Sequence, residues 1–301
     1  MKLTTNRLPV LTWNSLKMND VTLDVPDTDK SDVIKRHITS DDDPLEVMPF
    51  VFDEGLSYGG EVKIAVDPDI KSSIIMDFSS GDTGYSNVKT TIELRNKSHF
   101  TLYQVFKQGD EHLTVNDVYC RCEDMSSFEL VQIFLSGKEI YAQVKTDLDG
   151  TGSSLKIESA YKVVSDHILD INYVAIHSGE KSVSDIKAFG ALCDTAKKRF
   201  RGTIDFKPGC AGAIGNEAER VLLLDENVEN KTIPIILCAE ENVEGNHGAT
   251  IGKPDDETLY YMHSRGIDDV SINEMMKNAY VDALVSRLPE CEYKDSLLGK
   301  A

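Results

Sequence analysis

The feature that most constrains this chain is a long run of short β segments, from about Val62 to Cys238, with no helical segment among them. In many of these segments apolar residues recur at every second position, as in Leu155–Ile157 and Ile171–Tyr173. This alternation is typical of strands that bury one face. Polar turns such as residues 147–153 separate the segments. Strands spaced so evenly predict a mainly β fold: a sandwich, a barrel or a β-solenoid.

The sequence favours the solenoid among these three folds. Asn-Gly and Asp-Gly pairs, which close tight hairpins, are scarce, and Asp149-Gly150 is the only one in this region. So many strands in one stretch are also awkward for a simple sandwich, although no repeat of fixed period stands out. The predicted strands are Ser73–Phe78, Thr90–Leu94, Thr101–Phe106, Asp117–Cys122, Phe128–Leu135, Glu139–Thr146, Ser154–Val164, Ile168–Ile176, Ser184–Leu192, Lys198–Phe206, Val221–Leu224 and Thr232–Cys238.

The first 60 residues are polar and irregular, and they hold the only tryptophan, Trp13. An apolar patch with basic flanks, within residues 8–16, is expected to dock onto the β region that follows. We therefore predict an irregular N-terminal arm over residues 1–60, ordered by contact with the body of the protein. It is not expected to form a domain of its own.

The end of the chain carries clear helix signals. Pro254 suits the first position of a helix, where its missing N–H costs nothing, and Gly266 suits a left-handed exit. Ser271-Ile-Asn-Glu274 has the pattern of a capping box. Apolar residues follow it at spacings of three and four, and Pro289 ends the pattern. These signals predict a two-helix hairpin joined at residues 266–270.

The 301 residues carry 51 acidic and 32 basic side chains, a formal charge of −19. A field of this sign repels phosphate backbones and anionic lipid, so we expect neither nucleic-acid binding nor attachment to a membrane surface. No run of about 18 apolar residues predicts a membrane span, and the N-terminus lacks the continuous apolar core of a secretory signal. A cytoplasmic location is the simplest expectation.

The six cysteines form neither a zinc-type pair of pairs nor a dense disulfide framework, which fits that location. Cys120 and Cys122 are expected to lie on one face of a strand as two buried thiols. Enzyme motifs are missing from the sequence as well, including Gly-x-x-x-x-Gly-Lys-Ser/Thr, Gly-x-Ser-x-Gly and His-Glu-x-x-His. The chain is therefore not expected to be an enzyme, and in particular not to hydrolyse ATP itself.

The C-terminal part of the chain combines a His-Gly-Ala-Thr run with a Ser-Arg-Gly-Ile loop. The stretches concerned are His247-Gly-Ala-Thr-Ile-Gly252, Asp256-Glu-Thr-Leu-Tyr-Tyr-Met262 and Ser264-Arg-Gly-Ile267, with Phe200-Arg-Gly-Thr-Ile204, Val221–Leu224 and Thr232–Ile235 upstream. Together they resemble the signature of the SufB/SufD family, whose members are core components of the SUF iron–sulfur cluster assembly machine. The resemblance is most specific over roughly residues 198–288.

The resemblance implies a right-handed parallel β-helix followed by a C-terminal helical segment. The chain then divides into the arm at 1–60, a β-helix core at 61–245 and a helical, ATPase-binding segment at 246–301. Family members pair as homodimers or with a SufB-type paralogue, and each binds an ABC-type ATPase subunit, SufC, through the helical end. Closure of the ATPases is expected to twist the β-helices and expose the dimer interface, where iron and sulfur assemble.

Within the family the sequence favours the SufD type. The SufB type reads Glu-His-Glu-Ala where this chain has Asn246-His247-Gly248-Ala249, so the acidic neighbours of the histidine are missing. The cysteine that SufB proteins carry just before the segment 221–224 has no counterpart, because Glu219 and Arg220 occupy that place. The chain also has Gly245 where SufD proteins often carry a cysteine. A SufB-like cluster scaffold is the alternative.

The resemblance makes His247 the first candidate ligand for iron or a cluster. Its imidazole suits iron, and Gly245 and Gly248 leave room for a metal or sulfide to approach. The competing interpretation is a structural histidine that satisfies backbone groups. Glu244, the nearest carboxylate, and Cys210, in a loop of small residues, are further candidate ligands. No cofactor is expected to be firmly bound, although iron or an iron–sulfur cluster could bind transiently.

Other residues divide between packing and docking. Cys238, at the end of an apolar segment, is expected to pack in the core. Tyr260, Tyr261, Met262 and Arg265 are the candidate docking residues for the ATPase, because such side chains are favoured at the centres of interfaces. An apolar stripe at helical spacing is more often core, and the loop after these residues could be a plain helix turn.

A second class of function is a carbohydrate-active enzyme, since parallel β-helices also host polysaccharide lyases and hydrolases. Such enzymes need two or three carboxylates on adjacent coils beside an aromatic-lined groove. Here the acidic residues lie mostly in predicted turns, and aromatic residues make up only 7% of the chain. The leading hypothesis is therefore a non-catalytic, SufD-like assembly subunit.

Overall fold

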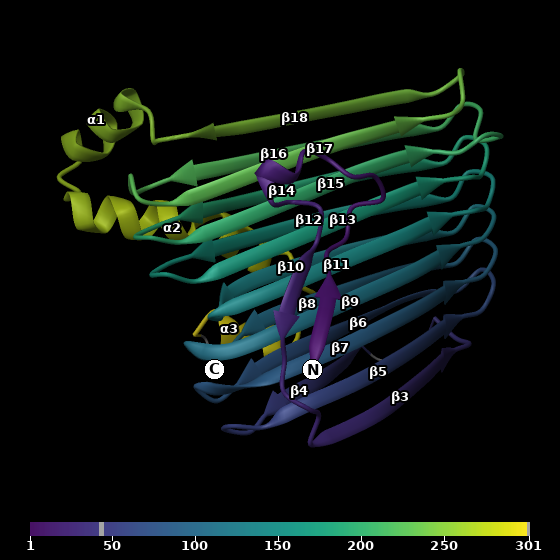
Figure 1. The fold of residues 1–301 in the computed structure, drawn as a ribbon, viewed down its shortest axis with the longest axis horizontal. Helices are drawn as coiled ribbons and strands as arrows, with labels where there is room; N and C mark the ends of the chain where they lie inside the picture. Colours follow the sequence, from purple (N-terminus) through teal and green to yellow (C-terminus); the bar gives the residue numbers. More distant parts are fainter. Residues whose placement is uncertain (42–44, 300–301) are drawn as a thin grey trace.

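The chain forms a β-solenoid in which successive coils stack along one axis (Figure 1). A computed structural model describes residues 1–41 and 45–299. Across these residues the coils build two parallel sheets of eight strands each. The odd sheet runs from β3 to β17 through the odd-numbered strands, and the even sheet runs from β4 to β18. The predicted β-solenoid is confirmed.

Each coil gives one strand to each sheet. The odd sheet consists of β3 (Lys30–Ile38), β5 (Ser57–Val66), β7 (Thr83–Leu94), β9 (Glu111–Cys122), β11 (Glu139–Leu148), β13 (Ile168–His177), β15 (Lys197–Phe206) and β17 (Glu229–Cys238). The even sheet consists of β4 (Glu46–Phe52), β6 (Lys71–Ser80), β8 (His99–Lys107), β10 (Ser127–Ser136), β12 (Ser154–Val163), β14 (Val183–Leu192), β16 (Ile214–Leu223) and β18 (Glu244–Gly252).

Smaller elements flank the coils on both sides. Before them lie the antiparallel strands β1 (Lys2–Thr5) and β2 (Val21–Asp24), with the short 3-10 helix η1 (Asn14–Leu16) in the loop between them. After them come the helices α1 (Asp256–Ser264), α2 (Asp269–Val285) and α3 (Glu292–Leu297).

Alternate side chains of each strand point into the solenoid, where residues in register form ladders along its axis. The clearest ladder consists of Phe50, Phe78, Phe106 and Phe134, at paired positions on β4, β6, β8 and β10. Their rings stack with centroids 5.0, 4.7 and 4.8 Å apart. Because each ring is buried by the rings of neighbouring coils, stacking creates a core that a single coil cannot form.

The parallel register is nearly constant along the solenoid. Gln143 on β11 lies beside Asn172 on β13, 29 residues later, and the two amides hydrogen-bond at 3.3 Å. Cys120 and Cys122 on β9 both lie in the core, and both are buried free thiols as predicted.

The solenoid begins earlier than the sequence pattern predicted. β3, β4 and β5 already form the first coils, so the arm ends before Lys30 and not near residue 60; residues 42–44 lie outside the described residues. Among the described residues β3 has a neighbouring strand on one side only, and most of its side chains are exposed. Its sequence is accordingly polar, which hid it from a search for apolar alternation.

The helical end also differs in detail from the prediction. β18 occupies residues 246–252, which had been assigned to the helical segment. Gly266, with a φ of +81°, provides the predicted left-handed exit between α1 and α2. The caps are Asp255 and Asp268 and not the predicted residues, and Asp268 accepts the N–H of Ser271 at 2.7 Å. A carboxylate three residues upstream is the better cap, so Ser271 lies inside the first turn.

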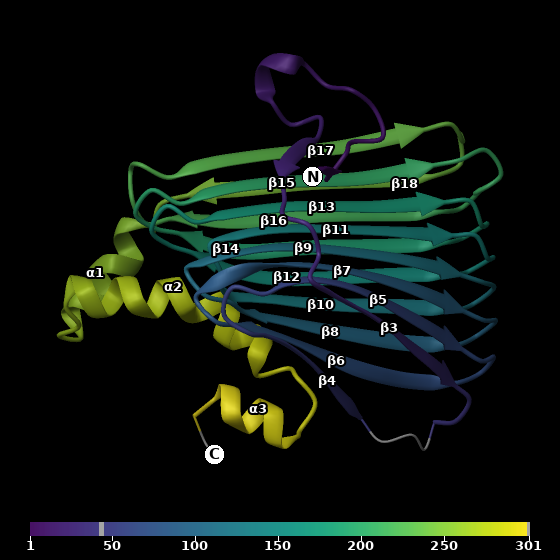
Figure 2. The ribbon, with the colours of Figure 1, turned by 60° about the horizontal axis from the view of Figure 1, so that its bottom comes forward.

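Helices α2 and α3 pack on the outward face of the even sheet (Figure 2). Val281, Leu284 and Val285 of α2 join a buried cluster with side chains of β8, β10 and β12. Arg287, just after α2, pairs with Glu158 of β12 at 2.6 Å. Among the residues described, no helix has the length and apolar character needed to cross a membrane.

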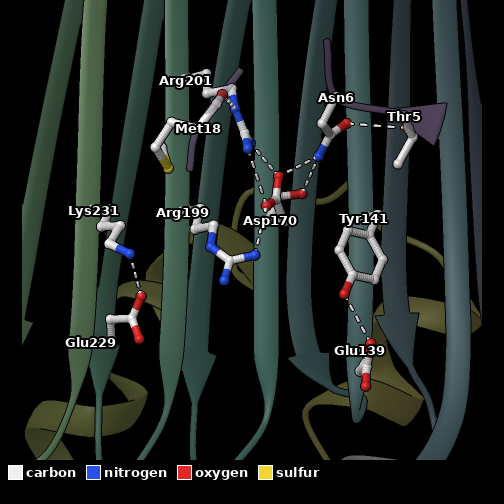
Figure 3. A network of polar contacts seen from close by, with 10 residues as sticks. All are labelled: Thr5, Asn6, Met18, Glu139, Tyr141, Asp170, Arg199, Arg201, Glu229 and Lys231. Atoms are coloured by element: carbon white, nitrogen blue, oxygen red, sulfur yellow. Dashed lines mark hydrogen bonds and ion pairs between the residues drawn. The ribbon is translucent and has the colours of Figure 1, made fainter. Parts of the chain in front are cut away.

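A buried polar network fixes the N-terminal arm to the outward face of the odd sheet (Figure 3). Asn6 Nδ2 donates to Asp170 Oδ1 at 2.5 Å and to its main-chain oxygen at 2.9 Å. Arg201 pairs with the same carboxylate, and its Nε donates to the Met18 carbonyl at 2.7 Å. The arm thus docks on the body as expected, but its apolar patch is not the contact, because Trp13 is 80% exposed.

Candidate functional site

The solenoid ends in an open coil. Within the described part of the chain, β17 pairs only with β15 and β18 only with β16, so each strand leaves one edge unpaired. The residues of β18 from Glu244 to Ile251 are exposed, and β17 is half-buried up to Leu237. An unpaired edge of this length is a template for pairing with another chain.

His247 stands at the mouth of this open coil. On β18 it lies beside Glu217 of β16 in the parallel register, so the two side chains are on the same face of the even sheet. Glu217 is 4% exposed, whereas His247 is exposed because β18 is the last strand of its sheet. The imidazole therefore lies one strand above a buried carboxyl group.

Two residues along β16, Glu219 is fully bonded within the interior. It forms an ion pair with Lys198 of β15, and both side chains are completely buried. Thr232 of β17 donates to its Oε2 at 2.6 Å, and the hydroxyl of Tyr161 donates to its Oε1 at 3.1 Å. This network joins the last coils in a low-dielectric environment, where such bonds are strong.

Glu217 differs from Glu219 because its Oε2 has no hydrogen-bond partner. Its carboxyl lies against the β15 backbone: a Cβ added at Gly202 would approach Glu217 Cδ to 2.3 Å. Burial raises the pKa of Glu217 to about 8, Glu219 raises it further, and Lys198 partly offsets both. Burial also lowers the pKa of Lys198, against the opposing effect of Glu219. Glu217 is thus a neutral acid at pH 7, which could release its proton to an approaching cation.

The structure does not gather the three candidate ligands on one face. Glu244 lies three residues before His247, so its side chain is on the opposite face of β18, where Asn246 Nδ2 donates to it at 3.0 Å. Cys210 is buried after β15 beside Phe206, and burial raises the pKa of its thiol. Across residues 1–41 and 45–299, no group of three or more His, Cys, Asp or Glu side chains is arranged to hold a metal ion.

Two residues of this end were not identified from the sequence. Cys238 does not pack in the core as predicted: it is exposed at the end of β17, and its Sγ lies 3.1 Å from the Glu240 carbonyl oxygen. Glu217 was not selected at all. The signal that could have found it is the alternation of Glu217, Glu219 and Val221, which places two carboxyl groups on the apolar face of one strand.

A sequence model of the family described as "SUF system FeS cluster assembly, SufBD core domain" matches residues 53–280. The chain belongs to the SufBD family. The matched region extends from the first coils into α2 and includes both the open coil and the His247 position. The resemblance drawn from the C-terminal signature is thereby confirmed.

Relatives of this SufBD chain include two proteins named iron–sulfur cluster assembly protein SufD. The Bacillus subtilis protein is 32% identical over 114 residues, 38% of this chain and 26% of the relative. The Escherichia coli protein is 24% identical over 218 residues, 72% of this chain and 51% of the relative. A SufBD family protein of Mycobacterium leprae is 19% identical over 264 residues, 85% and 67% of the two chains. The matches support a SufD-like chain and span about half or less of the two SufD proteins.

The SufBD chain also presents an exposed aromatic tip, which projects past the strand ends at α1 (Figures 1 and 2). Tyr260 and Tyr261 are 76% and 57% exposed, and Val270 at the start of α2 is 74% exposed. The Arg265 guanidinium lies over the Tyr261 ring, 5.1 Å from its centroid. Met262, the fourth candidate docking residue, is half-buried. Exposed aromatic and arginine side chains of this kind mark interaction sites.

Proposed function

We propose that this chain is a SufD-like, non-catalytic core subunit of the SUF assembly complex and works in the cytoplasm. It helps to build an iron–sulfur cluster, which is its cargo and not a resident cofactor. Membership of the SufBD family supports the general role, and the similarity to two SufD proteins supports the subtype.

The observation that carries this proposal is the open last coil, where His247 stands over the buried neutral carboxyl of Glu217. The described residues supply too few ligands for a metal ion there. A second subunit, either a SufB-type paralogue or another copy, would cover the unpaired edges of β17 and β18. It would also bring thiolate or carboxylate ligands to His247, and thiolates are the natural ligands of iron–sulfur clusters. The cluster would then form at the seam between two solenoids.

The second part of the proposal is that a SufC-type ABC ATPase docks on the helical tip. Tyr260, Tyr261 and Arg265 provide its exposed contact surface. The helices behind the tip are anchored to the even sheet by apolar contacts and by the Arg287–Glu158 pair. Movement of the ATPase would therefore be transmitted to the solenoid, and two ATPases would shift the two solenoids at their seam.

The iron content of the assembled complex tests the cluster site. The chain is co-expressed with its paralogue and ATPase, purified without oxygen, and analysed for iron and acid-labile sulfide per complex. His247→Ala removes an exposed side chain, so the complex should assemble normally while its iron content falls several-fold. The matched control is Val51→Ser, at a 66% exposed position on β4 near the other end of the solenoid. Unchanged iron in the His247 variant would rule out this residue as a ligand.

A further inference from the structure

The loop between β1 and β2 exposes a large apolar patch. Its residues 7–19 form a lobe that stands out from the outward face of the odd sheet (Figure 2). Leu11 and Trp13 are 75% and 80% exposed, and Val10 and Leu16 are each 40% exposed. Four large apolar side chains on one short loop make the kind of surface that marks an interaction site.

Hydrogen bonds, and not burial, hold this lobe in shape. Asn19 Oδ1 accepts the main-chain N–H and the hydroxyl of Thr12 at 2.7 and 2.9 Å. Its Nδ2 donates to the Thr12 carbonyl at 3.2 Å and to Asn14 Oδ1 at 3.0 Å. The Leu8 N–H closes the base of the lobe by donating to the Asn19 carbonyl at 2.8 Å. The apolar patch is therefore preorganised, which reduces the entropy lost when a partner binds.

The lobe stands beside the open coil. The Met18 carbonyl accepts a hydrogen bond from Arg201 on β15, and Arg201 is paired in register with Ile233 on β17. The foot of the lobe is therefore one strand, about 5 Å, from the unpaired edge of the odd sheet. In Figure 1 the 3-10 helix η1, which lies within the lobe, is seen in front of this end of the solenoid.

The outward face of β17 is apolar where it adjoins the lobe. Ile233, Ile235 and Leu237 alternate with the inward residues of β17, and their β15 neighbours include Arg201, which carries the lobe. All three are half-buried. A strand face that remains in water normally carries polar side chains. Three branched aliphatic side chains in a row indicate a face that becomes covered.

The two surfaces carry opposite charge. Residues 7–19 contain Arg7 and Lys17 and no acidic side chain, and neither cation has an ion-pair partner within the described residues. Residues 224–247, which form the last coil, contain six acidic side chains and one basic side chain, Lys231. In a chain of charge −19, contact between the lobe of one copy and the last coil of another brings opposite charges together.

We propose that the lobe is a clamp for a second copy of this chain. Trp13 and Leu11 cross the seam and pack on the outward face of the other copy's last coil, along its row from Ile233 to Leu237. The clamp rests on the proposed function in taking the two last coils as the meeting surface. A two-fold axis makes the contact reciprocal, so each copy contributes one lobe and receives one.

The lobe is long enough for this contact. A strand added at the edge of β17 lies about 10 Å from β15, where the foot of the lobe is held. The five residues from Met18 back to Trp13 can span about 15 Å when extended. Trp13 can therefore reach past the edge without release of the Met18–Arg201 bond.

Fluorescence of Trp13 tests the clamp directly, because it is the only tryptophan. The emission maximum and acrylamide quenching of the full-length chain are measured across a dilution series, and sedimentation velocity gives the fraction of dimer. We expect a blue shift and at least a threefold fall in the quenching constant as the dimer forms. A dimer whose Trp13 is as easily quenched as in the monomer would overturn the clamp and leave the seam intact. The clamp is also refuted if the chain does not self-associate where its pairing with a paralogue is complete.

A matched pair of variants adds a second measurement. Leu11→Ser and Val51→Ser each remove an exposed aliphatic side chain, 75% and 66% exposed, so both should fold normally. Leu11→Ser should weaken the dimer by about tenfold, as expected for a contact near an interface centre, and Val51→Ser should not. Ile235→Lys on β17 tests the seam itself. If Ile235→Lys abolishes the dimer while Leu11→Ser leaves its dissociation constant unchanged, the seam stands and the clamp is wrong.

Discussion

Replacing Glu217 with glutamine should stabilise the protein at neutral pH. The pKa of Glu217 is about 8 in the folded chain, against an ordinary value of 4.5. Folding therefore takes up a proton between these pH values, so stability falls as the pH rises through this window. At pH 7 the cost of keeping the carboxyl protonated is about 3 kcal/mol, from about 2.5 pH units at 1.36 kcal/mol each. Glutamine mimics the protonated acid and avoids this cost.

Urea unfolding followed by far-UV circular dichroism at three pH values measures the effect. At pH 7 Glu217→Gln should exceed the wild type by up to about 3 kcal/mol in the free energy of unfolding. Near pH 4.5 the two proteins should agree within about 0.5 kcal/mol, because the unfolded carboxyl is then half protonated. Above pH 8 the difference should level off, because Glu217 is ionised in both states.

Glu219→Gln is the matched control, on the same face of the same strand. It leaves the fully buried Lys198 without its charge partner, so it should destabilise the chain by about 3–5 kcal/mol at pH 7. Two identical substitutions, two residues apart, are thus expected to have opposite signs. The reasoning is refuted if both variants lose stability, or if the gain from Glu217→Gln is the same at pH 4.5 and pH 8.5.

Two further predictions concern packing and the helical anchor. Gly190→Ala would place a Cβ 2.1 Å from ring carbons of the buried Tyr161 and should cost about 2–3 kcal/mol, whereas Gly248→Ala, with nothing within 4 Å, should change stability by less than about 0.5 kcal/mol in thermal denaturation. Equal melting temperatures would show that the ring moves aside freely. Arg287→Met breaks the pair that, chiefly through Arg287, holds the pKa of Glu158 at about 2, and should cost about 1–2 kcal/mol at pH 7. Because Glu158 has a depressed folded pKa, this difference should shrink as the pH falls from 4.5 towards 2; a difference that persists at pH 2 would exclude the ion pair as its cause.

The solenoid could be predicted because its signals are local. Alternating apolar residues and scarce hairpin turns were enough to favour stacked coils over a sandwich. The repeat itself is visible in hindsight, since the stacked Phe50, Phe78, Phe106 and Phe134 recur every 28 residues. It was overlooked because later coils lengthen and exchange the aromatic ring for other residues. At Gly190, for example, the ring of Tyr161 fills the space that a side chain would need.

The site could be predicted only in part, because it depends on where stacking stops. His247 was found through the family signature, but its place beside Glu217 follows from a parallel register that joins residues 30 apart. The apolar context of Cys238 predicted burial, yet burial there requires a further coil, and β17 is the last strand of its sheet among the described residues. The exposed Trp13 likewise depends on Asn6 and Arg201, which meet at Asp170 only in the folded chain.

Binding of the SufC-type ATPase tests the central claim, that this chain is an assembly subunit driven by a separate motor. The two full-length proteins are co-expressed and purified by a tag on one of them, and their stoichiometry is measured with and without ATP. Tyr260 and Tyr261 are exposed on α1, which has no buried residue, so a double alanine variant should fold normally. We expect one ATPase per chain, with affinity about tenfold or more weaker in the double variant and unchanged in Val51→Ser. No association under any nucleotide condition would contradict the claim.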